Sequence, residues 1–163
     1  MKSTFDKAFQ AVLHWEGGYV DDPGDPGGET KYGISKQAYP DLDIAGLTKK
    51  RAKQIYRSDY WEPSGCDELP SGLDLFAFDT AVNCGVRFAI RALQQAVGTN
   101  CDGIFGPQTK AAAEAADPRE ALREYVARRG VRYGKLDTFS RFGLGWMRRL
   151  SHIHQLALSL TKE

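Results

Sequence analysis

The stretch FDKAFQAVLHWEGGYVDDPGDPGGETKYGIS, residues 5–35, holds the strongest structural signals in the chain. Its apolar residues recur at helical spacing and predict an amphipathic helix: Phe5, Ala8, Phe9, Val12 and Leu13. Gly17 and Gly18 predict the end of that helix, because glycine tolerates the left-handed conformation that closes a last turn. Residues 21–34 are dense in Asp, Pro and Gly. They predict a turn-rich loop that runs into a short hairpin through residues 30–34.

The rest of the chain is dominated by helical patterns that begin at capping residues. Ser3, followed by Asp6, is the predicted cap of the first helix, and Thr48 and Ser71 cap the next two. Further helices are predicted over 48–60, 71–84 and 87–97, from Pro107, from Asp117-Pro118, and over 143–160. The predicted fold is therefore mainly α, a helical bundle with a small β-hairpin beside the first helix.

Length and charge restrict the class of protein. A chain of 163 residues with 42% apolar residues can bury one core, or two small lobes that share a surface. Residues 1–88 hold 10 basic and 14 acidic side chains, whereas residues 89–163 hold 12 and 7. The basic half can contact an anionic surface. Because there is no long basic run and no clear zinc-finger or helix-turn-helix signature, we expect no nucleic-acid partner.

The cysteines and the N-terminal stretch suggest where the protein is made. Cys66, Cys84 and Cys101 form an odd set without metal-ligand spacing, so we expect free thiols and no metal. The N-terminal stretch lacks the apolar core of a secretory signal, and no apolar run is long enough to cross a bilayer. We therefore expect synthesis in the cytoplasm without stable membrane insertion.

Glu16 is the first candidate for catalysis. It lies eleven positions after Phe5, close to three helical turns, and so continues the apolar stripe of the first helix. Burial disfavours the charged form of a carboxylate, which suits a general acid that works near neutral pH. The alternative is an exposed glutamate at a frayed helix end.

The loop after Glu16 supplies two further polar candidates, Asp25 and Thr30. Glycosidic cleavage needs a proton donor and a second group that manages water or the cationic transition state. Glu16, Asp25 and Thr30 can supply an acid, a base and a water-positioning hydroxyl. Each of the latter two also has a structural interpretation, Asp25 as a turn residue and Thr30 as a strand residue.

These motifs resemble a known enzyme family. HWEGGYVDDPGDPGGETKYGIS is similar to the signature of the phage and prophage muramidases of glycoside hydrolase family 108. The resemblance extends over nearly the whole chain, through IYRSDYW (55–61), LFAFDTAVNCG (75–85), LQQAVGTNCDGIFGPQT (93–109) and FGLGWMRRL (142–150).

The resemblance implies a lysozyme-like α+β lobe over residues 1–88 that hydrolyses the β-1,4 bond between N-acetylmuramic acid and N-acetylglucosamine. It places the catalytic acid at Glu16. The Glu, Asp and Thr are also similar to a set in phage lysozymes, where five residues separate Asp from Thr instead of four. Residues 89–163 resemble a helical peptidoglycan-binding module packed on that lobe. Asp102 lies in a matching motif, whose alternative interpretation is a structural turn before a helix.

Several other residues are candidates for binding the sugar chain. Tyr19 and Tyr32 flank the loop, and aromatic rings can stack on sugar faces. Asp79 and Asn83 share one helix face, where they either line the cleft or cap a buried loop. Core packing is the default for the remaining candidate rings, Tyr60, Trp61 and Trp146. His14 is expected either to support the site or to pack. His152 and His154 are spaced poorly for a metal pair.

We therefore expect an endolysin-type muramidase that needs no cofactor, acts as a monomer on bacterial peptidoglycan and lyses the host cell. Without an export signal, it would require a membrane-permeabilising partner such as a holin to reach the wall. Two alternatives remain. A lytic transglycosylase also uses a single glutamate but forms an anhydro-sugar end, and a non-catalytic peptidoglycan-binding module would explain the basic C-terminal half but not Glu16.

Overall fold

The fold of the chain is known from a computed structural model that describes residues 4–21 and 28–161. The elements follow in the order α1 (Phe5–Glu16), β1 (Thr30–Lys31), β2 (Ile34–Ser35), α2 (Lys49–Tyr56), η1 (Arg57–Trp61), η2 (Cys66–Glu68), α3 (Leu73–Cys84), α4 (Val86–Ala96), α5 (Pro107–Ala115), α6 (Pro118–Gly134) and α7 (Phe139–Leu160). The predicted fold class, mainly α with one small antiparallel hairpin beside the first helix, is confirmed. No helix in the described part of the chain has the length and apolar composition of a membrane span.

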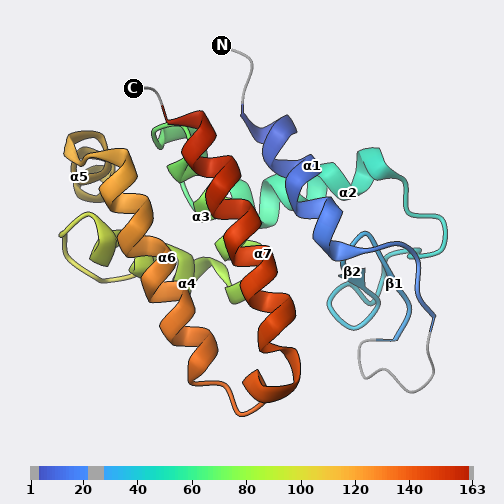
Figure 1. The fold of residues 1–163 in the computed structure, drawn as a ribbon. Helices are drawn as coiled ribbons and strands as arrows, with labels where there is room; N and C mark the ends of the chain where they lie inside the picture. The colour runs from blue at the N-terminus through green and yellow to red at the C-terminus, as the bar shows by residue number, and fades with distance from the viewer. Residues whose placement is uncertain (1–3, 22–27, 162–163) are drawn as a thin grey trace.

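Helix α3 lies at the centre of the molecule (Figure 1). Its residues from Leu73 to Ala81 are buried without interruption, and it packs against α1, α4, α6 and α7. A helix surrounded in this way must be apolar all round or have its polar groups paired. Helix α3 therefore joins both halves of the chain in one hydrophobic core. The boundary predicted between residues 88 and 89 falls inside α4, and the division into two lobes stays a prediction.

An aromatic cluster fixes α1 against the core. The ring of Phe5 lies 5.0 Å from Trp61 and 5.7 Å from Phe78, and the ring of Phe9 lies 5.5 Å from Tyr56. Trp61 is only 1% exposed, as the core-packing interpretation predicted. Because large rings bury much apolar surface with defined geometry, this cluster fixes the first two turns of α1 against the core.

Two predicted caps are confirmed and one is wrong. The Thr48 hydroxyl accepts a hydrogen bond from Arg51 N, and the Asp117 carboxylate caps α6 as its sequence predicted. Ser71 is not a cap, because α3 begins at Leu73 after Gly72. The predicted cap Ser3 lies outside the described residues; α1 follows Thr4, whose side chain makes no capping bond.

Two helices differ in extent from their sequence patterns. Helix α2 passes into a π-helical turn at Arg57, which a regular 3.6-residue pattern does not predict. Helix α7 begins at Phe139, four residues earlier than expected. Gly143 and Gly145 weaken the helical signal there, but Phe139 and Phe142 pack on the ring of Trp146 in the same helix, and that ring packs on Tyr133 of α6, so these contacts outweigh propensity.

The three cysteines are free thiols, as predicted. Cys66 is buried, and burial raises the pKa of its thiol well above the ordinary value. It therefore stays protonated and packs as a small apolar residue. Cys84 and Cys101 are partly exposed.

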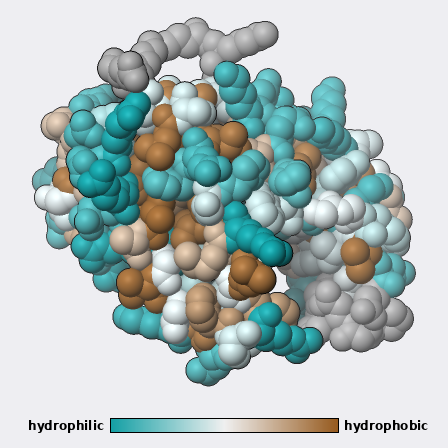
Figure 2. Space-filling view, viewed as in Figure 1, coloured by the Kyte–Doolittle hydropathy of each residue, from teal (hydrophilic) through white to brown (hydrophobic). Residues whose placement is uncertain are grey.

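The surface differs between the helical side and the hairpin side of the molecule. On the face seen in Figure 2, apolar side chains gather over the helices, whereas the side of the hairpin is mainly hydrophilic or neutral. Helix α7 contributes exposed apolar side chains, among them Phe142, Leu144 and Met147.

We predict that Gly72→Ala destabilises the fold more than Gly85→Ala. Both glycines have positive φ, +95° and +90°, so each substitution strains the backbone by about 1–3 kcal/mol. At Gly85 a Cβ meets open space, but at Gly72 it lies 2.5 Å from the carbonyl oxygen of Ala157 in α7. The free energies of unfolding, measured in urea, should differ by at least about 1 kcal/mol. Equal losses would show that α3 and α7 can move apart at no cost.

Candidate functional site

Glu16 is the last residue of α1 and lies at the edge of the core. Gly17, with φ of +72°, ends the helix directly after it, as the sequence predicted. The side chain of Glu16 is 19% exposed, so solvent reaches it only in part. It follows Val12 by one helical turn on the face that buries Phe5, Ala8 and Phe9. The predicted position on the apolar stripe is therefore confirmed.

The hairpin turn covers the carboxylate of Glu16. Tyr32 and Gly33 connect the two strands, and both have positive φ, +53° and +75°. This combination is typical of a tight two-residue hairpin turn. A Cβ on Gly33 would lie 2.6 Å from the hydroxyl of Tyr56 and 2.8 Å from Oε2 of Glu16. Only glycine allows the backbone of the turn to come this close to the carboxylate.

Tyr56 holds the turn in place. Its hydroxyl donates a 2.8 Å hydrogen bond to the carbonyl of Tyr32. Burial raises the pKa of Tyr56, and the charge of Glu16 raises it further, so the phenol keeps its proton. The turn is thus anchored to α2, which in turn packs on α1 through the ring of Phe9.

An arginine from the other end of the chain binds Glu16. The Nη1 atom of Arg149 in α7 lies 2.6 Å from Oε1 of Glu16. Its Nε and Nη2 atoms donate to one oxygen of Asp79 in α3, at 3.0 and 2.8 Å. Burial lowers the pKa of Arg149, but the carboxylates of Asp79 and Glu16 raise it above its ordinary value. Arg149 therefore stays charged and holds Glu16 in one orientation.

A second arginine completes the network behind Arg149. Arg129 in α6 is fully buried, and its Nη1 atom lies 2.6 Å from the other oxygen of Asp79. Its Nε atom donates to the hydroxyl of Tyr133 at 2.7 Å, and that hydroxyl donates to Asn83. Together with Glu16 and Arg149, the cluster holds two carboxylates and two guanidinium groups. The charges balance, as buried ionic groups require.

The network defines the environment of Asp79. The sequence left two roles open for Asp79, lining the cleft or capping a buried loop, but its side chain has no exposed surface and both of its oxygens bind arginines. Asp79 is therefore connected to Glu16 through Arg149, and its burial does not favour the cleft-lining role. Asn83, one turn further along α3, is exposed and accepts from Tyr133, so it remains a candidate for binding substrate.

Thr30 and Tyr19 lie around the hairpin. Thr30 forms a backbone bridge to Val20, with both N–H···O distances at 2.8 Å, and its hydroxyl donates to the carbonyl of Gly28 at 3.2 Å. Tyr19 is 49% exposed and donates to Glu29 at 2.9 Å. Both residues are thus held within the segment that follows Glu16, and their roles in catalysis and sugar binding stay predictions. Asp25 lies outside the described residues.

Asp102 belongs to a structural turn. One of its oxygens accepts from the Nε2 atom of Gln94 at 2.8 Å and from the backbone N–H of Ile104 at 2.9 Å. The hydrogen bond from Gln94 lowers the pKa of Asp102. Gln94 is buried and also binds Gly103 and Thr109. The structural interpretation of this motif therefore accounts for Asp102, whose predicted role in binding substrate has no support in its contacts.

Sequence reasoning missed Arg129, Arg149 and Gly33. A signal for the arginines exists, because each occupies a core position on an apolar helical stripe: Leu122, Tyr125, Arg129 and Tyr133 in one helix, and Trp146, Arg149, Ile153 and Ala157 in the other. A buried cation needs a buried anion. Asp79, in the apolar run of α3, is the matching signal. Nothing in the sequence pairs these residues with one another.

The chemistry available at this site is proton transfer. Glu16 is a partly exposed carboxylate with one oxygen fixed by a cation and the other beneath the hairpin turn. His14 and His152 contact Trp15, whose indole N–H donates to His152, and neither histidine reaches Glu16 through a described hydrogen bond. Within the described ranges, no three His, Cys, Asp or Glu side chains lie close enough to hold a metal ion.

Comparisons with known proteins match both halves of the chain. A protein-family model described as glycosyl hydrolase 108 matches residues 9–85, and a second, described as a predicted peptidoglycan domain, matches residues 88–151. A solved structure described as that of Brucella abortus SagA is 37% identical, with a TM-score of 0.89. The alignment covers 100% of this chain and 98% of that chain. A search of curated proteins gave no match.

We predict that Asp79→Asn lowers the free energy of unfolding by about 3 kcal/mol, because it leaves two buried arginines without their shared carboxylate. Asn83→Ala is the matched control on the same helix face, and it should cost about 1 kcal/mol because its side chain is exposed. Urea denaturation of both variants measures the difference. Equal losses of unfolding free energy would mean that the ion pairs of Asp79 with the two arginines do not stabilise the fold.

Proposed function

This chain belongs to the glycosyl hydrolase 108 family, and from that premise we propose that it is an N-acetylmuramidase with Glu16 as its general acid. The two family models identify a glycosidase that degrades peptidoglycan. The bond that we propose it cleaves is the β-1,4 linkage between N-acetylmuramic acid and N-acetylglucosamine. The observation that carries the proposal is the half-shielded carboxylate of Glu16, held by Arg149 beneath the hairpin turn.

In the proposed reaction, Glu16 donates its proton to the glycosidic oxygen while the bond to the anomeric carbon breaks. The water oxygen bonds to that carbon and one O–H bond of the water breaks. The released proton returns to the enzyme carboxylates, so that Glu16 is protonated again, and the product has a reducing sugar end. We propose that Asp25 activates or orients this water, or stabilises the cationic transition state, with help from Thr30. The backbone bridge between Thr30 and Val20 supports this role, because it holds the threonine against the segment that directly follows Glu16.

Arg149 affects both protonation states of the acid. Its bond to Glu16 stabilises the carboxylate that forms when the proton leaves. When Glu16 is protonated, Arg149 still keeps two hydrogen bonds to Asp79, so its own charge remains paired. Glu16 can therefore gain and lose a proton without leaving an unpaired guanidinium group in the core. Arg149 is thus a positioning residue for the proposed acid.

We further propose an endolysin role, in which the enzyme is made in the host cytoplasm and reaches the wall through a membrane opened by a holin or a similar partner. This proposal rests on the resemblance of the loop motif to phage muramidases. We also propose that the protein works as a monomer. A lysis assay of cells that express the protein with and without a holin tests the role in host lysis.

We predict that Glu16→Gln lowers the release of reducing ends from purified peptidoglycan by at least about 100-fold, because the amide cannot donate the proton. Glu62→Gln, a surface substitution in an exposed pair with Arg57, is the matched control and should retain activity. Mass spectrometry of the fragments identifies the bond. Anhydro-sugar ends would establish a lytic transglycosylase, and wall binding without cleavage by the unmodified protein would leave only a binding module.

We predict that Gly33→Ala lowers the same activity by about ten- to 100-fold, because its methyl group displaces the turn from Glu16. Gly98→Ala is the control: its φ is +69°, so the backbone strain is similar, but a Cβ there meets no atom within 4 Å and the residue lies in the turn after α4, away from Glu16. Initial rates of both variants are compared after circular dichroism has shown that each is folded. Full activity of Gly33→Ala would contradict the proposed contact between turn and acid.

A further inference from the structure

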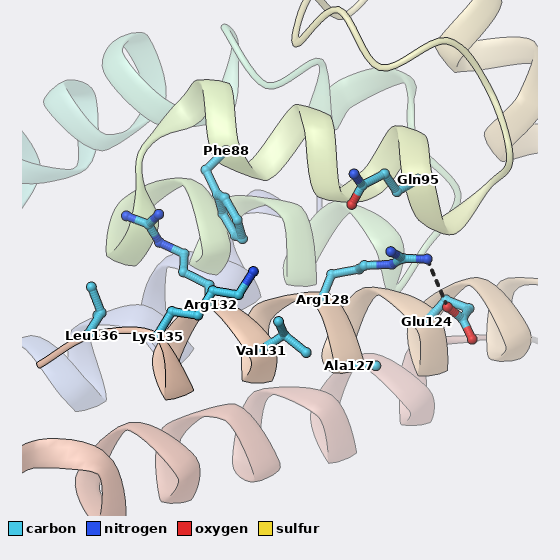
Figure 3. Close-up of a pocket in the computed structure, with 9 residues that line it drawn as sticks. All are labelled: Phe88, Gln95, Glu124, Ala127, Arg128, Val131, Arg132, Lys135 and Leu136. Carbon is cyan, nitrogen blue, oxygen red and sulfur yellow. Dashed lines mark ion pairs between the residues drawn. The ribbon is translucent and has the colours of Figure 1, made fainter. Parts of the chain in front are cut away.

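A groove that includes no residue of the Glu16 network runs between α4 and α6. Its volume is about 490 Å³. Figure 3 shows Phe88 projecting from α4 toward α6, which supplies most of the remaining wall. Helix α6 and the two residues after it contribute side chains from Glu124 at one end of the groove to Lys135 and Leu136 at the other. All of these residues lie in the segment matched to the predicted peptidoglycan domain.

The walls of the groove are positively charged. Arg128, Arg132 and Lys135 line it, and the only acidic side chain among its lining residues is Glu124. Glu124 pairs with Arg128 at 3.6 Å. Within the described part of the chain, Arg132 and Lys135 have no carboxylate partner within ion-pair distance. Two cations are therefore available to a ligand.

The groove also has apolar surface beside these charges. Val131 is 58% exposed and Leu136 is 39% exposed, although both are aliphatic. The guanidinium group of Arg132 lies 4.6 Å from the ring centre of Phe88, so the ring orients the cation without neutralising it. The surface thus suits a ligand that carries carboxylates next to short aliphatic groups.

We propose that this groove binds the peptide stem of peptidoglycan. The stem carries free carboxylates, which would pair with Arg132 and Lys135, and methyl side chains, which would contact Val131, Leu136 and Phe88. Its amino group would face Glu124 at the opposite end. The inference deepens the proposed function, since it rests on peptidoglycan being the substrate.

The length of the groove supports this occupant. Glu124 in α6 and Lys135, the residue directly after α6, are eleven positions apart. This spacing corresponds to about 16 Å at about 1.5 Å per residue. An extended stem of about five residues spans about 17 Å. The sugar backbone is a poorer occupant, because neutral sugar hydroxyls do not require two unpaired cations.

The test uses the full chain in a Glu16→Gln background, so that binding is measured without cleavage. The groove variant is Arg132→Gln with Lys135→Gln. The control is Arg87→Gln with Arg91→Gln, which removes the same charge from exposed positions on α4 that face the turn at Gly103. The single variant Lys135→Gln repeats the measurement at an exposed site in case the double variant is poorly folded.

Each protein is sedimented with intact peptidoglycan and with glycan strands whose stems have been removed by an amidase. We expect the groove variant to bind intact peptidoglycan about five- to tenfold more weakly than the background protein, and the control to bind as well as it. Both should bind the stripped glycan equally. A soluble stem tetrapeptide, titrated by calorimetry, should bind the background protein but not the groove variant.

Three results would overturn the proposal. The first is equal binding of intact peptidoglycan by the groove and control variants. The second is a loss of affinity by the groove variant that is as large on stripped glycan as on intact peptidoglycan. The third is weaker binding of the groove variant to anionic phospholipid vesicles with unchanged binding to peptidoglycan. The last would indicate a membrane surface as the occupant. Failure of the proposed muramidase activity is recognised separately, because it would abolish reducing-end release by the unmodified protein and leave these binding results unchanged.

Discussion

The arrangement of the site depends on one ion pair, the bond between Arg149 and Glu16. The two residues are 133 positions apart in the chain, yet their charged atoms lie 2.6 Å apart. This distance requires α7 to pass the end of α1 with Arg149 level with Glu16. Asp79 in α3 holds α7 in that position, because it also binds Arg149. The position of α3, in turn, is held by contacts with four helices. The orientation of a partly exposed carboxylate thus follows from packing throughout the core.

Much of this fold follows from local pattern. The stripe from Phe5 to Val12 and the glycine after Glu16 were sufficient to place α1 and to put Glu16 at its end. Thr48 and Asp117 marked helix starts because their side chains bond nearby backbone N–H groups. The start of α7 at Phe139 was not predicted, because ring contacts within the helix and between Trp146 and Tyr133 of α6 outweigh two glycines that local propensity counts against it.

The candidate site was less predictable, because its partners are far apart in sequence. The position of Glu16 depends only on its own helix, so the helical spacing of the apolar residues was enough to predict it. Asp79 was singled out from the face that it shares with Asn83, but its arginine partners were not foreseen, since a pattern shows which face a residue shares and not what lies opposite. Arg149 and Gly33 acquire their roles only when α7 and the hairpin meet at the end of α1.

The shared position of Asp79 between two arginines also bears on how such proteins evolve. The aspartate belongs to the segment matched to the hydrolase model, and both arginines lie in the segment matched to the predicted peptidoglycan domain. Recombination that exchanged either segment for an unrelated one would leave an uncompensated charge in the interior. The two segments are therefore expected to be inherited as a pair and to diverge together, unlike modules that are shuffled freely on flexible linkers.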